Sequence, residues 1–226
     1  EIMISRIKTH LELASYRNEL EMLVAEKTAT IENLQDSMVM GLAELVECRD
    51  GETGGHIKRT GKYLQILAEA ICMNNLYSNI LTDEYVNNMI RSAPLHDIGK
   101  IGISDSILLK NGTFDDNERE YMKQHTILGG KALQKIIDVT DGETFLYIAK
   151  DMALSHHEKW DGTGYPYGLS GTNRRPYKQA LSHSKAIEII IESSGTHFDP
   201  DIVKIFKSIH PRFEQVSKIY TNELEV

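Results

Sequence analysis

The first forty residues contain neither proline nor glycine, and this uninterrupted stretch constrains the fold more than any other feature. Those two residues are the least compatible with a helix interior, so Ile2 to about Cys48 is predicted to form one long helix. Positions at alternating spacings of three and four would form a seam along it, and five of the seven are apolar or aromatic: Leu13, Tyr16, Leu20, Leu23, Lys27, Thr30 and Leu34. Two interpretations remain open, a signalling helix that dimerises and a helix that packs on its own domain.

The remaining residues also follow helical patterns, without the sustained alternation of apolar and polar residues that marks strands. Asp115-x-x-Glu118 resembles a capping box at the start of a helix that is predicted to end at His125. Another helix is predicted to end at His156, and Asp199-Pro200 has the N-cap and first-turn residues of a last helix. The sequence therefore predicts an all-α fold, a helical bundle preceded by a long N-terminal helix.

Composition narrows the classes of function. A formal net charge of −8 argues against a general nucleic-acid surface. The two cysteines lie far apart, so we expect free thiols in a cytoplasmic protein rather than a disulfide framework. The sequence contains no run of 18 apolar residues, so it predicts no membrane-spanning helix. Because the chain begins at Glu1, we expect part of a longer protein, with residues 1–36 as a linker and residues 37–226 as a domain.

Two histidine-centred pairs carry the chemistry. His96-Asp97 precedes Ile98-Gly99-Lys100, and His156-His157 comes shortly before a glycine-rich turn. Imidazole and carboxylate ligands suit Fe, Mn or Zn, and a set without thiolates argues against a structural zinc site. Adjacent residues on a regular helix point about 100° apart, so such pairs either serve several ions or lie where a helix unwinds. One histidine alone is more often a satisfied core residue, but two pairs favour metal ligands.

Two further histidines have suggestive neighbours. His56 follows Gly54-Gly55, and His125 lies on an amphipathic helix. Two divalent ions about 3.5–4 Å apart can hold a phosphoryl oxygen and activate a water molecule. Lys100 could neutralise developing charge or protonate a leaving oxygen. The residues alone therefore indicate a metal-dependent hydrolase.

Three motifs resemble the HD-GYP family, phosphodiesterases of the wider HD superfamily that hydrolyse the bacterial messenger cyclic di-GMP. The segment from His96 to Gly102 resembles the HD core of that family. The segment from His156 to Leu169, with Gly164-Tyr165-Pro166 inside it, resembles the GYP signature. Arg175-Pro176-Tyr177-Lys178 resembles the R-x-Y-K element, and the likeness runs from about Glu52 to Pro200.

The resemblance implies which residues build the site. Lys100 would contact the scissile phosphate and act with His96 and Asp97 as the catalytic residues. The metal ligands would hold two or three divalent ions, Fe or Mn: Glu52, His56, His96, Asp97, His125, His156 and His157. Glu52 would accompany a third ion, which some members of the family lack. The residues that would bind the substrate or shape its pocket are Gly164, Tyr165, Arg175 and Lys178. For Arg175 and Lys178 the alternative is a solvated basic loop.

The implied reaction is hydrolysis of cyclic di-GMP to linear pGpG, and the resemblance leaves open whether it continues to GMP. Three alternatives remain: a catalytically impaired module that only binds cyclic di-GMP, an HD phosphohydrolase acting on another cyclic dinucleotide, and a structural dimerisation domain. The segment from Arg6 to Leu13 resembles the closing helix of a response-regulator receiver domain running into a linker. The expected partners are therefore an upstream receiver or sensor domain and a second copy that pairs through the N-terminal helix.

One element of the family is missing from this sequence. The resemblance implies a long helix with an aspartate ligand between the Gly-Leu-x-Gly turn and the R-x-Y-K element, but Asn173 joins directly to Arg174. The segment is either deleted, or it is a disordered part of the protein that the sequence leaves out. Matching residues on both flanks favour disorder, because losing a core helix would destabilise the fold severely. A site without that carboxylate should hold metal less completely.

Overall fold

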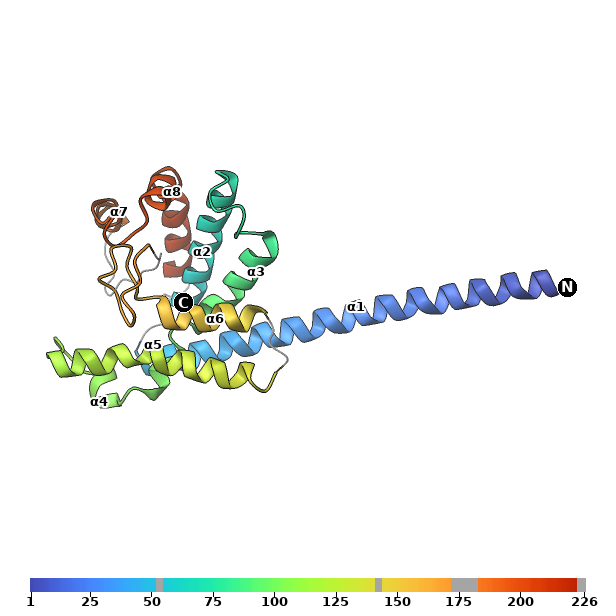
Figure 1. The fold of residues 1–226 in the computed structure, drawn as a ribbon, viewed down its shortest axis with the longest axis horizontal. Coiled ribbons are helices and arrows are strands. Elements are labelled where there is room, and N and C mark those ends of the chain that lie inside the picture. The colour runs from blue at the N-terminus through green and yellow to red at the C-terminus, as the bar shows by residue number, and fades with distance from the viewer. Residues whose placement is uncertain (52–54, 141–143, 172–182, 223–226) are drawn as a thin grey trace. The chain divides into compact units, whose positions relative to one another are not determined.

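The computed structural model describes residues 1–51, 55–140, 144–171 and 183–222, and helices make up nearly all of its regular structure (Figure 1). In these ranges no strand forms, and only two isolated bridges occur, Asp161 with Ser170 and Ser194 with Phe198. The prediction of an all-α fold is confirmed. Four predicted features lie outside the described residues: Glu52, Arg175, Lys178 and the junction of Asn173 with Arg174.

Helix α1 spans Ile2–Arg49, so the long N-terminal helix is confirmed. Its residues up to Gly41 form one compact unit, and the chain from Leu42 onward forms another. The predicted boundary between residues 36 and 37 stays a prediction. In the first unit the apolar members of the predicted seam are exposed: Leu13, Tyr16, Leu20, Leu23 and Leu34. The last turns of α1, in the second unit, bury Ala43, Val46 and Glu47.

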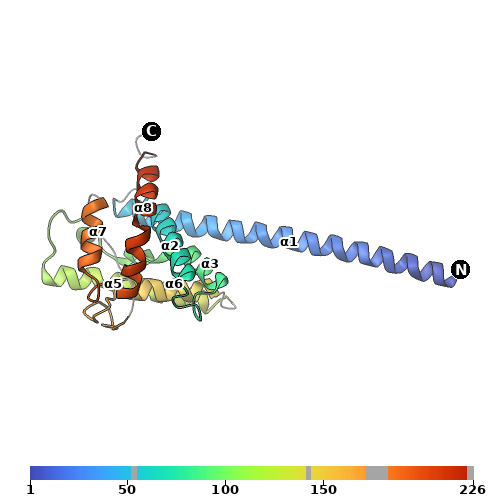
Figure 2. The same cartoon turned by 90° about the horizontal axis from the view of Figure 1, so that it is seen from above.

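The second unit is a bundle whose longer helices pack in pairs. Helix α2 (Gly55–Met73) packs against α8 (Pro200–Asn222), beside which it lies in Figures 1 and 2. Helix α6 (Thr144–Ser155) contacts both α3 (Asp83–Ser92) and α5 (Asp116–Ile137). One core cluster joins α2, α3 and α6 and consists of Ala68, Met89, Ala93, Ile148 and Met152.

Short segments connect α3 to α5 and carry the predicted HD core. They are η1 (Ala93–Leu95), η2 (Ile98–Gly102) and α4 (Asp105–Leu108). Because η2 packs against α5, the residues around Lys100 are held close to the helix that carries His125. Helix α7 (His183–Glu192) lies against α8.

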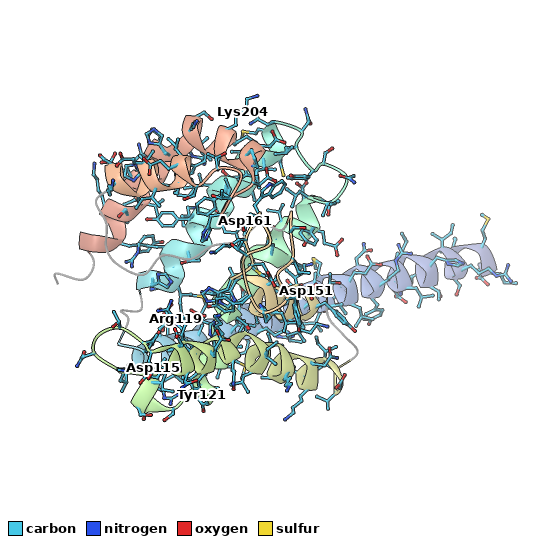
Figure 3. All side chains as sticks on the ribbon, turned by 60° about the vertical axis from the view of Figure 1, so that its left-hand side comes forward. Asp115, Arg119, Tyr121, Asp151, Asp161 and Lys204 are labelled. Carbon is cyan, nitrogen blue, oxygen red and sulfur yellow. The ribbon has the colours of Figure 1, made fainter. Side chains whose placement is uncertain are left out.

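Two helix starts follow the sequence signals. The side chain of Asp115 accepts from the amide of Glu118 at 2.9 Å, and the side chain of Glu118 accepts from the amide of Asp115 at 2.9 Å. This is the predicted capping box. Asp199 accepts from the amide of Asp201 at 2.7 Å and so caps α8, as expected. Charged residues such as Asp151 on α6 and Lys204 on α8 are exposed (Figure 3).

The predicted end of a helix at His125 is wrong, because α5 continues to Ile137. Two glycines beyond His125 would ordinarily weaken a helix, but here they allow close packing. A Cβ on Gly129 would lie 3.3 Å from Cβ of Ala153, and one on Gly130 would lie 2.4 Å from Leu154. His125 is therefore held in the middle of a long helix. Among the described residues, no helix combines the length and apolar character that crossing a membrane requires.

Candidate metal centre

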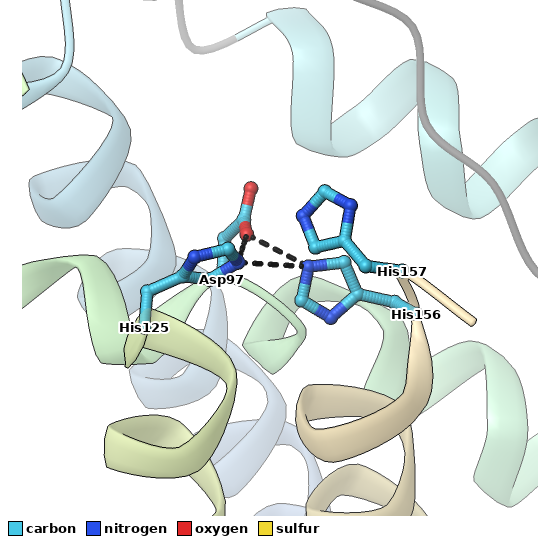
Figure 4. A group of neighbouring side chains, drawn as sticks. All are labelled: Asp97, His125, His156 and His157. Atoms are coloured by element: carbon cyan, nitrogen blue, oxygen red, sulfur yellow. Dashed lines mark hydrogen bonds and ion pairs between the residues drawn. The ribbon is translucent and has the colours of Figure 1, made fainter. Parts of the chain in front are cut away.

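Four of the predicted ligands converge in the second unit: Asp97, His125, His156 and His157 (Figure 4). One ligand atom from each lies within 4.8 Å of the corresponding atoms of the other three. Asp97 lies between η1 and η2, His125 on α5, and the remaining two directly after α6. We call these four residues the inner group. His125 and His156 are buried, and the other two are partly buried.

The end of α6 explains how two adjacent histidines face one site. The helix ends at Ser155, so His156 and His157 follow its last residue. Their ring centroids are 4.3 Å apart. On a regular helix the two side chains would diverge by about 100°. Of the two sequence-based interpretations, the structure supports a pair that lies where a helix ends.

Backbone carbonyls orient three of the histidine rings. In each ring Nδ1 lies at hydrogen-bonding distance from the carbonyl oxygen three residues earlier: His96 from Ala93 at 2.8 Å, His125 from Met122 at 2.7 Å, and His156 from Ala153 at 3.1 Å. A carbonyl oxygen can only accept, so Nδ1 carries the proton, and Nε2 of a neutral ring keeps its lone pair. Metal-binding histidines are commonly oriented by such a bond from the other ring nitrogen.

The resulting arrangement fits a bound cation. Nε2 of His125 and Nε2 of His156 are 3.1 Å apart. Oδ1 of Asp97 lies 3.3 Å from the first nitrogen and 3.2 Å from the second. This buried oxygen has no well-aligned hydrogen bond. Two lone pairs and a carboxylate oxygen repel one another at these distances, whereas a divalent ion among them would be bound by all three.

Burial sets the charge states of this group. It lowers the pKa of His156, and it lowers the pKa of His157 to about 2, so both rings favour the neutral form that binds metal. Burial alone would raise the pKa of Asp97, but the positive charge of a protonated His96 holds this pKa well below its usual range. The group therefore offers the carboxylate of Asp97 and the neutral imidazoles of His156 and His157.

His96 and His56 continue the site away from the inner group, and with Glu47 we call them the outer group. Nε2 of His96 lies 3.3 Å from Oδ2 of Asp97. The rings of His96 and His56 have centroids 6.5 Å apart. Nε2 of His56 is 3.9 Å from Oε1 of Glu47, a buried residue of the last turns of α1. The structure thus brings His96 to the edge of the inner group and sets His56 farther out.

Lys100 contacts the same carboxylate oxygen of Asp97 as His96 does. Its Nζ donates to Oδ2 of Asp50 at 2.5 Å and lies 2.9 Å from Oδ2 of Asp97. Burial alone would lower the pKa of Lys100, but the charges and hydrogen bonds of Asp97 and Asp50 raise it well above its usual range. An amine with a raised pKa is a poor acid, so of its two candidate roles the geometry favours neutralising charge over donating a proton.

The turn after His157 packs tightly beside the inner group. The ring of Tyr165 stacks on that of His157, with centroids 4.4 Å apart and planes 18° apart. A Cβ on Gly164 would lie 2.4 Å from Cα of Glu158, so this position requires glycine. Glu158 is fully buried, and its two carboxylate oxygens accept from the amide of Tyr167 at 2.7 Å and that of Leu169 at 2.9 Å.

Sequence reasoning missed several residues that border the site. Glu47 and Asp50 were not singled out, although both are acidic residues just before the predicted ligand Glu52. Glu158 was part of a quoted motif but was given no role. Lys123, whose Nζ lies 5.4 Å from the ring centroid of Tyr165, has no local signal in the sequence.

Comparisons with known proteins agree with the geometry. A family model described as "HD domain" matches residues 21–173. A Vibrio cholerae protein named as a probable cyclic di-GMP phosphodiesterase is 35% identical over 98% of this chain and 56% of its own length. A second V. cholerae protein, named as a cyclic di-GMP phosphodiesterase, is 42% identical over 83% of this chain and 42% of its own. A third from that organism, named as a 3'3'-cGAMP-specific phosphodiesterase, is 32% identical over 74% and 33%.

The chain spans about half the length of the first two relatives. Two other features of these matches bear on the missing segment. The alignment with the first runs over 249 residues, although the chain has only 226, so this relative carries residues without a counterpart here. The family match ends at residue 173, the position at which the resemblance implies a missing helix. Both observations agree with an element absent from this sequence.

Proposed function

The chain belongs to the HD domain family, and on that basis we propose that it is a metal-dependent phosphodiesterase that hydrolyses cyclic di-GMP. The observation that carries the proposal is the inner group, in which Nε2 of His125, Nε2 of His156 and Oδ1 of Asp97 lie within 3.3 Å of one another. The names of two similar proteins support cyclic di-GMP as the substrate.

The proposed ligands would hold two or three divalent ions, and Fe or Mn suits their nitrogen and oxygen donors. They are His56, His96, Asp97, His125, His156 and His157, together with Glu52, which lies outside the described residues. Bound there, the ions would supply an activated water molecule and positive charge for the phosphoryl oxygens. The backbone carbonyls that hold the rings of His96, His125 and His156 keep the proposed ligand atoms turned toward the site.

Other residues would act directly on the substrate. Lys100, held as an ammonium by two carboxylates, would stabilise charge on the scissile phosphate. Tyr165 presents a stacked, partly buried ring beside His157 and would border the substrate pocket, and Gly164 lets this turn approach closely. Arg175 and Lys178, outside the described residues, would bind phosphate groups.

The products distinguish the proposal from its alternatives. Protein reconstituted with Fe(II) or Mn(II) under reducing conditions should convert cyclic di-GMP to pGpG, and chromatography would show whether GMP follows. A His96→Ala variant should lose this activity, and normal hydrolysis by that variant would rule out the proposed site. Binding without turnover would instead favour a catalytically impaired signalling module.

A second cyclic dinucleotide is a specific alternative, because one relative is named as specific for 3'3'-cGAMP. The two substrates share their phosphodiester linkages and differ in one base, so the metal ligands would accept both. Discrimination must then come from contacts to the base. Parallel assays with both compounds decide between them, and a higher kcat/KM for 3'3'-cGAMP would overturn the choice of substrate.

The missing segment also leads to a proposal. We favour a segment between Asn173 and Arg174 that belongs to the protein and carries a further aspartate ligand. Intact-mass spectrometry tests this, because a mass near 25.6 kDa for the chain would show that the segment is deleted. A protein without the aspartate should bind metal less completely than its relatives.

The N-terminal helix is proposed as the dimer contact. Its exposed side chains include Leu13, Leu20, Leu23 and Leu34, and we propose that they pair with a second copy in a cytoplasmic protein whose upstream receiver or sensor domain controls the enzyme. Replacing Leu20 and Leu23 with glutamate should convert a dimer to a monomer in sedimentation analysis. A chain that is monomeric at every concentration would contradict the proposal.

A further inference from the structure

Two residues at the C-terminal end of helix α1 contact the segment around Lys100. Arg49 is the last residue of α1, and Asp50 follows it, both within the second unit. Neither belongs to the proposed ligand set. They lie about fifty residues before Lys100 in the sequence, so their contacts with it are long-range and specific to the fold.

Arg49 binds backbone carbonyls within and just after η2, and it binds the side chain of Asp105 at the start of α4. Its Nη1 donates to the carbonyls of Lys100 and Ile101 at 3.0 Å each, and its Nη2 donates to that of Ile103 at 2.7 Å. Nε and Nη2 also donate to Oδ1 of Asp105, at 3.0 and 2.7 Å. The planar fork of guanidinium donors makes this possible, because a lysine ammonium presents its donors from a single atom.

Asp50 binds the side chain of the same lysine. Its Oδ2 accepts from Nζ of Lys100 at 2.5 Å, while Oδ2 of Asp97 lies 2.9 Å from that Nζ. The side chains of Asp50 and Lys100 are only 9% and 12% exposed, so water competes little for this pair. A lysine stem is flexible, and a second carboxylate restricts where its ammonium can lie.

We propose that Arg49 and Asp50 are positioning residues that hold Lys100, by its backbone and by its ammonium respectively, at the edge of the inner group. The proposal rests on the proposed function, in which Lys100 contacts the scissile phosphate. Neither residue needs to touch the substrate. A misplacement of about 1 Å in such a group can cost roughly 100-fold in rate, so loosening either contact should be visible in turnover.

Steady-state kinetics with cyclic di-GMP and the reconstituted chain test the Asp50 contact. Asp50→Asn should lower kcat by roughly 10- to 100-fold, with the same division between kcat and KM that Lys100→Met shows. In the double variant, Asp50→Asn should add nothing to Lys100→Met, because a residue acting only through Lys100 has no effect once it is gone. Independent, multiplicative losses would overturn the proposal.

Hydrogen exchange of the chain without substrate tests the Arg49 contact. Arg49→Lys keeps the charge but should speed exchange in residues 98–105 and lower kcat. Arg212→Lys is the matched control, because Arg212 also donates to a carboxylate, Glu69 at 2.8 Å, but does so between α2 and α8. The control should leave exchange in residues 98–105 and kcat unchanged.

The two measurements separate failure of this proposal from failure of the proposed function. If the wild-type chain shows no turnover, the proposed function fails, and exchange in Arg49→Lys still decides whether Arg49 holds the segment. If the wild-type chain turns over but Asp50→Asn and Arg49→Lys keep its kcat within about twofold, the positioning role is overturned while the function stands. Equal exchange in Arg49→Lys and the wild-type chain also overturns the Arg49 contact.

Discussion

The inner and outer groups use the same kinds of side chain but differ in how closely these are gathered. In the inner group the ring centroids of His125 and His156 are 5.2 Å apart. In the outer group the rings of His56 and His96 have centroids 6.5 Å apart. Ligands already gathered before an ion arrives lose less side-chain freedom when it binds. We therefore expect the inner group to bind its ion more tightly.

The largest expected effect comes from removing the carboxylate of the inner group. Asp97→Asn removes the negative charge and turns one ligand oxygen into an amide nitrogen. Residues that only hydrogen-bond to a metal ligand are each worth roughly 10- to 100-fold in metal affinity. Loss of a ligand itself should therefore lower the affinity by more than this. Calorimetric titration with Mn(II) measures the change. Asp151→Asn, at an exposed position on α6, is the control and should bind Mn(II) as the wild-type chain does.

The second prediction addresses the outer group. His56→Gln should lower the number of ions bound per chain by one and leave the tighter binding event in place. The reason is that His56 lies beyond His96 and outside the inner group. Elemental analysis and Mn(II) titration give the number and the affinity. Loss of the tighter event in this variant would contradict the proposed order of the two groups.

The sequence predicted those parts of the site that depend on local structure. His156 lies at a helix end because α6 stops at Ser155, and the capping box at Asp115 fixed the start of α5. All four members of the inner group were predicted ligands. Their grouping followed from a family resemblance, whereas periodicity alone would not have brought η2, α5 and α6 together.

The remaining features depend on contacts between distant segments. Nothing near Lys100 in the sequence indicates that Arg49 and Asp50 bind it. The wrong helix end at His125 has the same origin, because Gly129 and Gly130 serve the close approach of α6. A local sequence pattern cannot distinguish a glycine that ends a helix from a glycine that allows a neighbouring helix to pack closely.

The third prediction tests whether close backbone packing supports the inner group. A Cβ on Gly99 would lie 1.8 Å from the carbonyl oxygen of His125 and 2.4 Å from the amide of Gly129, so η2 and α5 would have to separate. Gly99→Ala should lower the free energy of unfolding by about 3 kcal/mol or more. Gly61→Ala, on α2 with open space around it, should raise this free energy by roughly 0.5–1 kcal/mol. Urea denaturation measures the stability of both variants. Wild-type stability in both of them would contradict the packing argument.

The smallest expected effect concerns the turn that follows the inner group. Glu158→Gln keeps the size of the side chain but turns one carboxylate oxygen into an amide that faces the N–H of Tyr167 or Leu169. A buried donor without an acceptor costs about 1–3 kcal/mol, which urea denaturation would show as lost stability. Glu188→Gln is the control, since it removes an exposed ion pair with Lys185 that water screens, and it should leave the stability close to that of the wild-type chain.

The same variant sharpens the comparison between the two groups. The turn held by Glu158 carries Tyr165, whose ring stacks on His157, so a looser turn should disturb the inner group before the outer one. Mn(II) affinity of the tighter event should fall in Glu158→Gln while the number of ions stays the same. If the weaker event changed instead, the turn would support the outer group, and the tightness of the inner group would have to come from α5 and η2 alone.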